Sequence, residues 1–273
     1  MKQIFFLLFA FWTVTCFSQN QFAEKEPFVI GETLTFQSDV LKEKRVVNIY
    51  LPPSYESENK KAYPVIYLLD GSADEDFIHI AGLVQFSTFP WAQLIPESIV
   101  VGIANVDRKR DFTYPTTNAK DKADFPTTGG SEKFIAFLEN ELQPLINRQY
   151  RTTMERTIIG QSLGGLLATE ILWKKPELFS NYIIISPSLW WDDNSLLPLK
   201  RAPLDNPKKV FVAVGEEGPI MESGAMALTA QLKQDRLIQT SFKYLEDLDH
   251  SNTLHIAVYE GFKAIYKKDV TKD

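Results

Sequence analysis

The sequence predicts an α/β fold, in which a mainly parallel sheet is covered by helices on both faces. Strand-like and helix-like segments alternate after an N-terminal pair of strands, a pattern that favours parallel strands with crossover helices. Residues 63–69 form a continuous apolar run, which is typical of a strand buried on both faces. The length of 273 residues suits one large domain, without an insertion long enough for a separate lid.

The N-terminal residues have the pattern of a secretion signal. Lys2 precedes an apolar run over residues 4–14, and Ser18-Gln19 offers a cleavage zone. That run is short for a membrane span. We therefore expect a signal peptide at residues 1–19, an α/β domain at 20–273, and a secreted or periplasmic protein. Lipid anchoring at Cys16, the only cysteine, is the alternative.

The composition argues against several classes of function. The formal net charge is −6 and the pI is near 5.3, so the basic surface of a nucleic-acid binder is not expected. The sequence contains no His-Glu-x-x-His and no cysteine cluster, so it predicts no metal site. It also has no P-loop and no Gly-x-Gly-x-x-Gly after a first strand, so it predicts no nucleotide cofactor.

The expected elements follow one another along the whole chain. The first two strands should form an antiparallel pair joined near residues 42–44, and Pro144 is expected to kink the first long helix. The predicted strands are 33–40, 46–51, 63–69, 98–104, 157–159, 182–186, 209–214 and 240–245, and the predicted helices of defined extent are 131–150, 222–236 and 254–266.

The segment around Ser162 predicts a nucleophile elbow. Ile158-Ile159 leads directly into Gly160-Gln161-Ser162-Leu163-Gly164, and a helical stretch follows at once. Gly160 and Gly164 are expected to avoid collisions across the tight turn, and Gly165 should let the helix approach the sheet. Ser162 is therefore the candidate nucleophile, with the N-terminus of a helix beside it.

A serine hydroxyl needs a general base, and the sequence offers three histidines. His79 precedes Ser162 in the chain, and His255 falls inside the final helix. His250 follows the last strand, which matches the α/β-hydrolase order of serine, acid and histidine. His250 is therefore the candidate base.

The acid that orients His250 is expected just after the strand that ends at Val214. Glu217 is preferred there, with Glu216 second and Glu222 third. The alternative is a solvated turn and a weakly supported serine–histidine pair.

Two further parts of the site can be predicted from position. The oxyanion donors should be the Leu163 N–H and an N–H from Gly71 or Ser72, because the loop after the strand at residues 63–69 supplies this group in α/β hydrolases. Trp190 and Trp191 follow another strand at the same edge of the sheet. They either cap the core or line an apolar substrate pocket.

Several segments resemble the putative-esterase family of α/β hydrolases, which includes esterase D, feruloyl and acetylxylan esterases, and siderophore esterases. These segments are residues 63–71, 108–113, 160–165 and 249–251, and the likeness is greatest to periplasmic siderophore esterases. The resemblance implies Ser162 as nucleophile and His250 as base. It also implies that Arg110, in the Arg-x-Arg-Asp loop, contacts the substrate. Relatives often have Gly-x-x-Glu-Gly where this chain has the shorter Gly215-Glu216-Glu217-Gly218, which leaves the acid open.

The sequence thus predicts a serine hydrolase that cleaves carboxylic esters through an acyl-enzyme on Ser162. A siderophore ester, or a carbohydrate or phenolic ester, is the expected small-molecule or glycan substrate. Two alternatives remain, an acyltransferase on the same fold and a binding module without catalytic activity.

Overall fold

The computed structural model describes residues 24–266. The predicted signal peptide at residues 1–19 and the alternative anchor Cys16 lie outside this range. None of the helices within residues 24–266 combines the length and the apolar character needed to cross a membrane.

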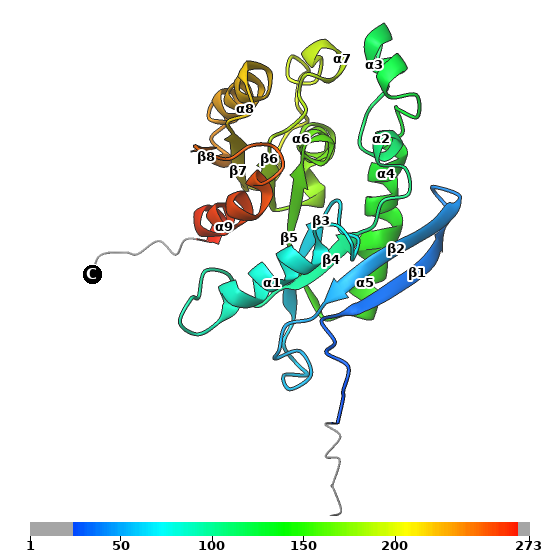
Figure 1. The fold of residues 1–273 in the computed structure, drawn as a ribbon, viewed down its shortest axis with the longest axis vertical. Coiled ribbons are helices and arrows are strands. Elements are labelled where there is room, and N and C mark those ends of the chain that lie inside the picture. The colour runs from blue at the N-terminus through cyan, green and yellow to red at the C-terminus, as the bar shows by residue number, and fades with distance from the viewer. Residues whose placement is uncertain (1–23, 267–273) are drawn as a thin grey trace, which may run out of the picture.

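The centre of the molecule is an eight-stranded sheet in the order β1-β2-β4-β3-β5-β6-β7-β8 (Figure 1). The six strands from β4 to β8 in this order run parallel, whereas β2 is antiparallel to β4 and β1 is antiparallel to β2. The predicted fold class is thereby confirmed. The strands are β1 Glu32–Ser38, β2 Glu43–Tyr50, β3 Tyr63–Leu68, β4 Ile99–Ile103, β5 Thr152–Gln161, β6 Asn181–Ile185, β7 Lys208–Gly215 and β8 Ile238–Leu245.

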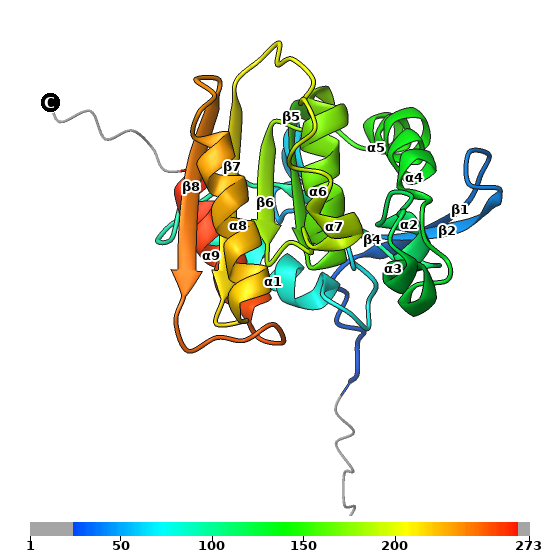
Figure 2. The ribbon, with the colours of Figure 1, turned by 90° about the horizontal axis from the view of Figure 1, so that it is seen from above.

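Helices cover both faces of the sheet and divide the core into two apolar clusters (Figures 1 and 2). One face carries α1 Phe77–Thr88 and α9 Thr253–Tyr266. The other face carries α4 Ser131–Phe137, α5 Gln143–Gln149, α6 Leu163–Lys174 and α8 Pro219–Leu232. The loops hold only short helices, which are α2 Arg108–Asp111, α3 Ala119–Asp124 and α7 Trp191–Asn194, and a 3₁₀ turn at Pro176–Leu178.

The predicted helix over residues 131–150 is interrupted before Pro144. A π-helical turn at Leu138–Leu142 separates α4 from α5, and Pro144 lies in the first turn of α5. Proline cannot donate a backbone hydrogen bond, and its ring clashes with the carbonyl four residues earlier. The wider turn resolves that conflict without ending the helix. The sequence thus predicted that Pro144 disturbs the helix, but it did not predict a π-helical turn.

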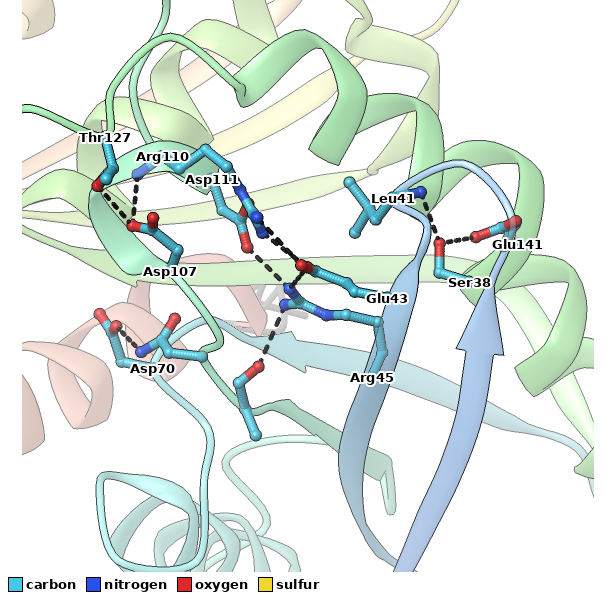
Figure 3. Close-up of polar contacts among 12 residues, drawn as sticks. Ser38, Leu41, Glu43, Arg45, Asp70, Asp107, Arg110, Asp111, Thr127 and Glu141 are labelled. Atoms are coloured by element: carbon cyan, nitrogen blue, oxygen red, sulfur yellow. Dashed lines mark hydrogen bonds and ion pairs between the residues drawn. The ribbon is translucent and has the colours of Figure 1, made fainter.

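A cluster of charged side chains, two of them buried, ties β2 to α2, as Figure 3 shows. Arg45 is fully buried, and its Nη1 donates to Asp111 Oδ2 at 2.8 Å and to Glu43 Oε1 at 2.9 Å. Arg110 adds bonds to the same two carboxylates, with Nε 2.8 Å from Asp111 Oδ1 and Nη2 2.6 Å from Glu43 Oε1. Two positive and two negative groups thus compensate one another, with Arg45 and Asp111 buried and Glu43 and Arg110 partly exposed, and this fixes the loop that follows β4.

Removal of one member of this cluster should destabilise the fold. Asp111→Ala leaves the buried Arg45 guanidinium with only Glu43 as a carboxylate partner, and an unpaired buried charge is costly. We expect the free energy of unfolding, measured by urea denaturation, to fall by about 3 kcal/mol. Asp124→Asn, which breaks the exposed pair with Lys120, is the control and should cost less than about 0.5 kcal/mol. Equal losses in the two variants would contradict this account.

Candidate active site

The carboxyl ends of the parallel strands bring the predicted catalytic residues to one edge of the sheet. Ser162 follows β5, Glu217 follows β7, and His250 follows β8. Ser162 and His250 both line two cavities at this edge, with volumes of about 450 and 390 Å³. The first also contains Ser188, Trp190, Glu216, Glu217, Met221 and Asp249; the second contains Asp70, Glu75, Asp76, Arg108 and Gln161.

Ser162 has the strained backbone of a nucleophile elbow. Its φ is 60° and its ψ is −121°, and α6 begins at the next residue. A Cβ on Gly160 would lie 2.4 Å from the Gly164 carbonyl oxygen, so only glycine allows the strand and helix to approach so closely. Gly165 likewise faces the Ile185 carbonyl, 2.9 Å from where a Cβ would lie. At Gly164 a Cβ would meet nothing closer than 3.5 Å, so the predicted collision there is wrong.

Glu217 is the carboxylate that contacts the histidine. Its Oε2 lies 2.5 Å from His250 Nδ1, and its side chain is 2% exposed, whereas that of His250 is 48% exposed. Glu216 is exposed. Glu222 instead accepts hydrogen bonds from the backbone N–H groups of Glu217 and Gly218 at 3.1 and 2.9 Å. Within residues 24–266, Glu217 is the one of the three predicted carboxylates that is hydrogen-bonded to the imidazole of His250.

The surroundings of Glu217 favour its ionised form. Burial alone would raise the pKa of Glu217, but hydrogen bonds from His250, Ser186 and the Gly215 N–H outweigh burial and lower the pKa below its ordinary value. The Gly215 N–H donates to Oε1 at 3.0 Å, and the Ser186 hydroxyl donates to the same oxygen. The carboxylate can therefore remain charged beside His250 and stabilise an imidazolium.

The predicted oxyanion donors differ in availability. Leu163 is the first residue of α6, where backbone N–H groups have no acceptor within the helix. The Gly71 N–H donates to the Ile103 carbonyl at 2.9 Å and so belongs to the sheet. The Ser72 N–H makes only a long bond of 3.4 Å to Glu75 Oε2. Of the two alternatives after β3, Ser72 therefore has the more available donor.

The two adjacent tryptophans have different roles. Trp190 is half-buried and lines the cavity that contains Ser162. Trp191 is fully buried, and its Nε1 donates to the Tyr114 carbonyl at 2.9 Å. The prediction that Trp191 binds substrate is thus not supported, because the core encloses its ring. Trp190 lines the pocket and Trp191 caps the core.

The arginine at the cleft is Arg108, and not the predicted Arg110. Arg108 donates from Nε and Nη2 to the two oxygens of Asp70 at 2.6 and 2.9 Å, and from Nη2 to the Gln161 carbonyl at 3.3 Å. It lines the second cavity, whereas Arg110 points into the charge cluster with Glu43. The Arg-x-Arg pattern identified the right loop but could not show which side chain faces the cleft.

The other two histidines lie apart from both cavities. His79 in α1 and His255 in α9 pack against each other, with ring centroids 4.6 Å apart. Burial, together with the charge of His79, lowers the pKa of His255. Neither residue lines a cavity with Ser162, which agrees with the choice of His250 by chain order.

The fold is that of an α/β hydrolase. Residues 38–263 match the family described as "Putative esterase", and the chain belongs to that family.

The chain is similar to several named esterases. It is 35% identical over 183 residues to the ferri-bacillibactin esterase BesA of Bacillus subtilis, an alignment that covers 62% of this chain and 63% of BesA. It is 31% identical over 150 residues to the siderophore triacetylfusarinine C esterase of Aspergillus fumigatus, covering 51% of this chain and 48% of that protein. These alignments thus span less than two thirds of each relative's own length.

A solved structure covers more of the chain. The IroE-like serine hydrolase from Shewanella oneidensis superposes with a TM-score of 0.76 at 29% identity, and the match covers 87% of this chain and 80% of the other. The likeness therefore extends across the sheet and both helical layers.

Asp76, which lies beside the cleft, carries a charge that the folded state disfavours. It precedes α1 and lines the second cavity. Burial, together with the negative charges of Asp70 and Glu75, raises the pKa of Asp76 to about 6. Because the pKa of Asp76 is lower in the unfolded chain, the contribution of Asp76 to the free energy of unfolding should decrease as pH rises from 4 towards 6 and then level off.

Asp76→Asn should therefore stabilise the protein at high pH and not at low pH. We expect a gain of about 1–2 kcal/mol at pH 8, which shrinks towards zero at pH 4.5, because asparagine keeps the shape without the charge. Thermal unfolding across that range measures the gain. Asp74→Asn is the control, since a hydrogen bond from Ser72 lowers the pKa of Asp74 and its neutralisation should give no gain. A gain at pH 8 that persists unchanged at pH 4.5 would rule out this explanation.

Proposed function

We propose that the protein is a serine esterase with Ser162 as nucleophile, His250 as general base and Glu217 as the orienting acid. The observation that carries the proposal is the 2.5 Å contact between His250 Nδ1 and Glu217 Oε2, at a cavity that also contains a serine on a nucleophile elbow. This arrangement directs a buried carboxylate at the imidazole and places the imidazole at the cavity that contains the serine, as the proposed roles require.

The proposed reaction has two halves. Ser162 Oγ attacks the ester carbonyl while His250 Nε2 takes its proton, and Glu217 stabilises the imidazolium. The Leu163 and Ser72 N–H groups hold the oxyanion, and one such donor is worth about 3–4 kcal/mol. The intermediate collapses as His250 gives the proton to the departing alcohol. Water, activated by His250, then attacks the acyl-enzyme and releases the carboxylic acid and Ser162.

We infer that the substrate is a siderophore ester, because named relatives hydrolyse such compounds. The ferri-bacillibactin and triacetylfusarinine C esterases support this substrate class. The first cavity offers two large apolar side chains, Trp190 and Met221, and the second offers the charged pair of Asp70 and Arg108. An ester whose two sides differ in polarity suits such a cleft. We further propose that the enzyme acts outside the cytoplasm, as the signal-like N-terminus predicts.

An ester panel tests the proposal. Wild type and Ser162→Ala would be compared on nitrophenyl acetate, nitrophenyl butyrate, methyl ferulate, acetylated xylan and a catecholate siderophore triester. We expect the siderophore triester to have the highest kcat/KM, and Ser162→Ala to lose at least about 10⁴-fold in kcat, because the nucleophile is removed. Full activity in Ser162→Ala would refute the proposed nucleophile.

Matched variants and fluorophosphonate labelling distinguish an esterase from an acyltransferase and from a binding module. Glu217→Gln should lose activity as an orienting acid does, while Glu216→Gln, which changes an exposed neighbour, should remain near wild type. A wild type that releases ester products only with an added acceptor alcohol would be an acyltransferase. A wild type that neither hydrolyses the panel nor labels at Ser162 with a fluorophosphonate would be a binding module.

Trp190 provides a test of the apolar side chains that line the first cavity. Trp190→Ala removes an aromatic surface beside Ser162, so KM for methyl ferulate should rise about tenfold and KM for nitrophenyl acetate should change much less. Steady-state kinetics on both esters measures the difference. Trp191→Phe, which keeps a core aromatic, is the control. Equal increases of KM for the two esters would eliminate Trp190 as an aromatic contact.

A further inference from the structure

The turn Ser186-Pro187-Ser188, which follows β6, contacts the catalytic residues on both sides. In the sheet β6 lies between β5, which ends at the nucleophile, and β7, which leads to the acid. Both serines are buried, with 0% and 2% of their surface exposed. Each hydroxyl reaches a different member of the proposed triad.

Ser186 is bonded to the side that carries the acid. Its N–H continues the sheet by donating to the Ala213 carbonyl at 2.8 Å, and its φ of 43° is unusual for a residue with a side chain. In this conformation its hydroxyl donates to Glu217 Oε1, which also accepts the Gly215 N–H. Because Oε1 takes both bonds, the second oxygen, Oε2, is directed at His250.

Ser188 is bonded to the side that carries the nucleophile. Its N–H donates to the Ser162 carbonyl at 3.0 Å, and its Oγ lies 3.3 Å from Ser162 Oγ. The Ser162 N–H donates in turn to the Ile185 carbonyl at 3.1 Å. The backbone and the hydroxyl of the nucleophile are thus both attached to residues 185–188.

We propose that Ser186 and Ser188 are positioning residues of the active site, an inference that rests on the proposed esterase function. Ser186 orients the Glu217 carboxylate and favours its charged form. Ser188 holds the Ser162 hydroxyl in one rotamer. Neither serine exchanges a proton or a bond with the substrate. A single three-residue turn therefore sets the geometry of nucleophile and acid together, although none of its residues belongs to the triad.

The two serines should give different kinetic signatures. Without the hydroxyl of Ser186, the Glu217 carboxylate is less stabilised and the histidine–glutamate pair holds its proton to higher pH. In Ser186→Ala the acidic limb of the kcat/KM profile should therefore move to higher pH, and the plateau should fall about tenfold. In Ser188→Ala kcat should fall about three- to tenfold, with KM and the acidic limb unchanged.

Two further variants separate positioning from folding. Ser186→Gly removes the hydroxyl and relieves the positive φ, so it should reproduce the pH shift even if Ser186→Ala folds poorly. Ser98→Ala is the matched control, because Ser98 is buried and its hydroxyl donates to the Pro96 carbonyl, outside both cavities. It should retain wild-type kinetics. Thermal unfolding measures the stability of every variant.

The outcomes distinguish this inference from the proposed function. Rates of fluorophosphonate labelling at Ser162 should fall in the Ser186 and Ser188 variants and stay constant in Ser98→Ala. If wild type hydrolyses esters and labels, while the Ser186 variants keep the acidic limb and the Ser188 variant keeps kcat, the positioning role is overturned and the esterase stands. A wild type that neither labels nor hydrolyses esters overturns both.

Discussion

The active site depends on the close approach of strand β5 and helix α6 at the nucleophile elbow. There is no space for a Cβ at Gly160, because the Gly164 carbonyl would lie 2.4 Å from it. The chain between these glycines must therefore turn sharply, and Ser162 takes a φ of 60° that would be unfavourable in isolation. Hydrogen bonds with the end of β6 and the turn after it, and a helix α6 that is buried from Leu163 to Trp173, hold the strained residue in place.

The order of strands determines how the remaining groups reach Ser162. The strands β3, β5, β6 and β7 are neighbours in the sheet, and their parallel direction collects their loops at one edge. Ser162 and Glu217, the proposed nucleophile and acid, follow strands that are separated by β6. This explains why the turn after β6 contacts both of them. The sheet order thus accounts for the position of Ser186 and Ser188 without reference to the reaction.

The sequence predicted those parts of the molecule that short-range patterns determine. The apolar runs identified the strands, the glycine–serine pattern identified the elbow, and chain order selected His250 from three histidines. The same patterns gave only residues 157–159 of β5, a ten-residue strand, because its first half is polar and partly exposed.

The sequence could not determine which way a side chain or an N–H group points where distant residues decide it. Arg110 faces away from the cleft because Glu43, 67 residues earlier, binds it. Trp191 enters the core because the Tyr114 carbonyl, 77 residues away, accepts its N–H. Gly71 has its N–H in the sheet because β4 passes beside it. A pattern along the chain can place such residues in the right loop, but their partners determine which way they point.

For the proposed acid, local hydrogen bonds show which glutamate contacts His250, a choice that the spacing along the sequence left open. The resemblance to other esterases did not choose between Glu216 and Glu217 in the segment Gly215-Glu216-Glu217-Gly218. Glu217 can fold back because the Gly215 N–H, two residues earlier, binds its Oε1, and because Glu222 accepts the N–H groups of Glu217 and Gly218. Gly218 completes the turn with a φ of 84°. Glu222 thus binds the backbone of the turn, and the Glu217 carboxylate contacts His250.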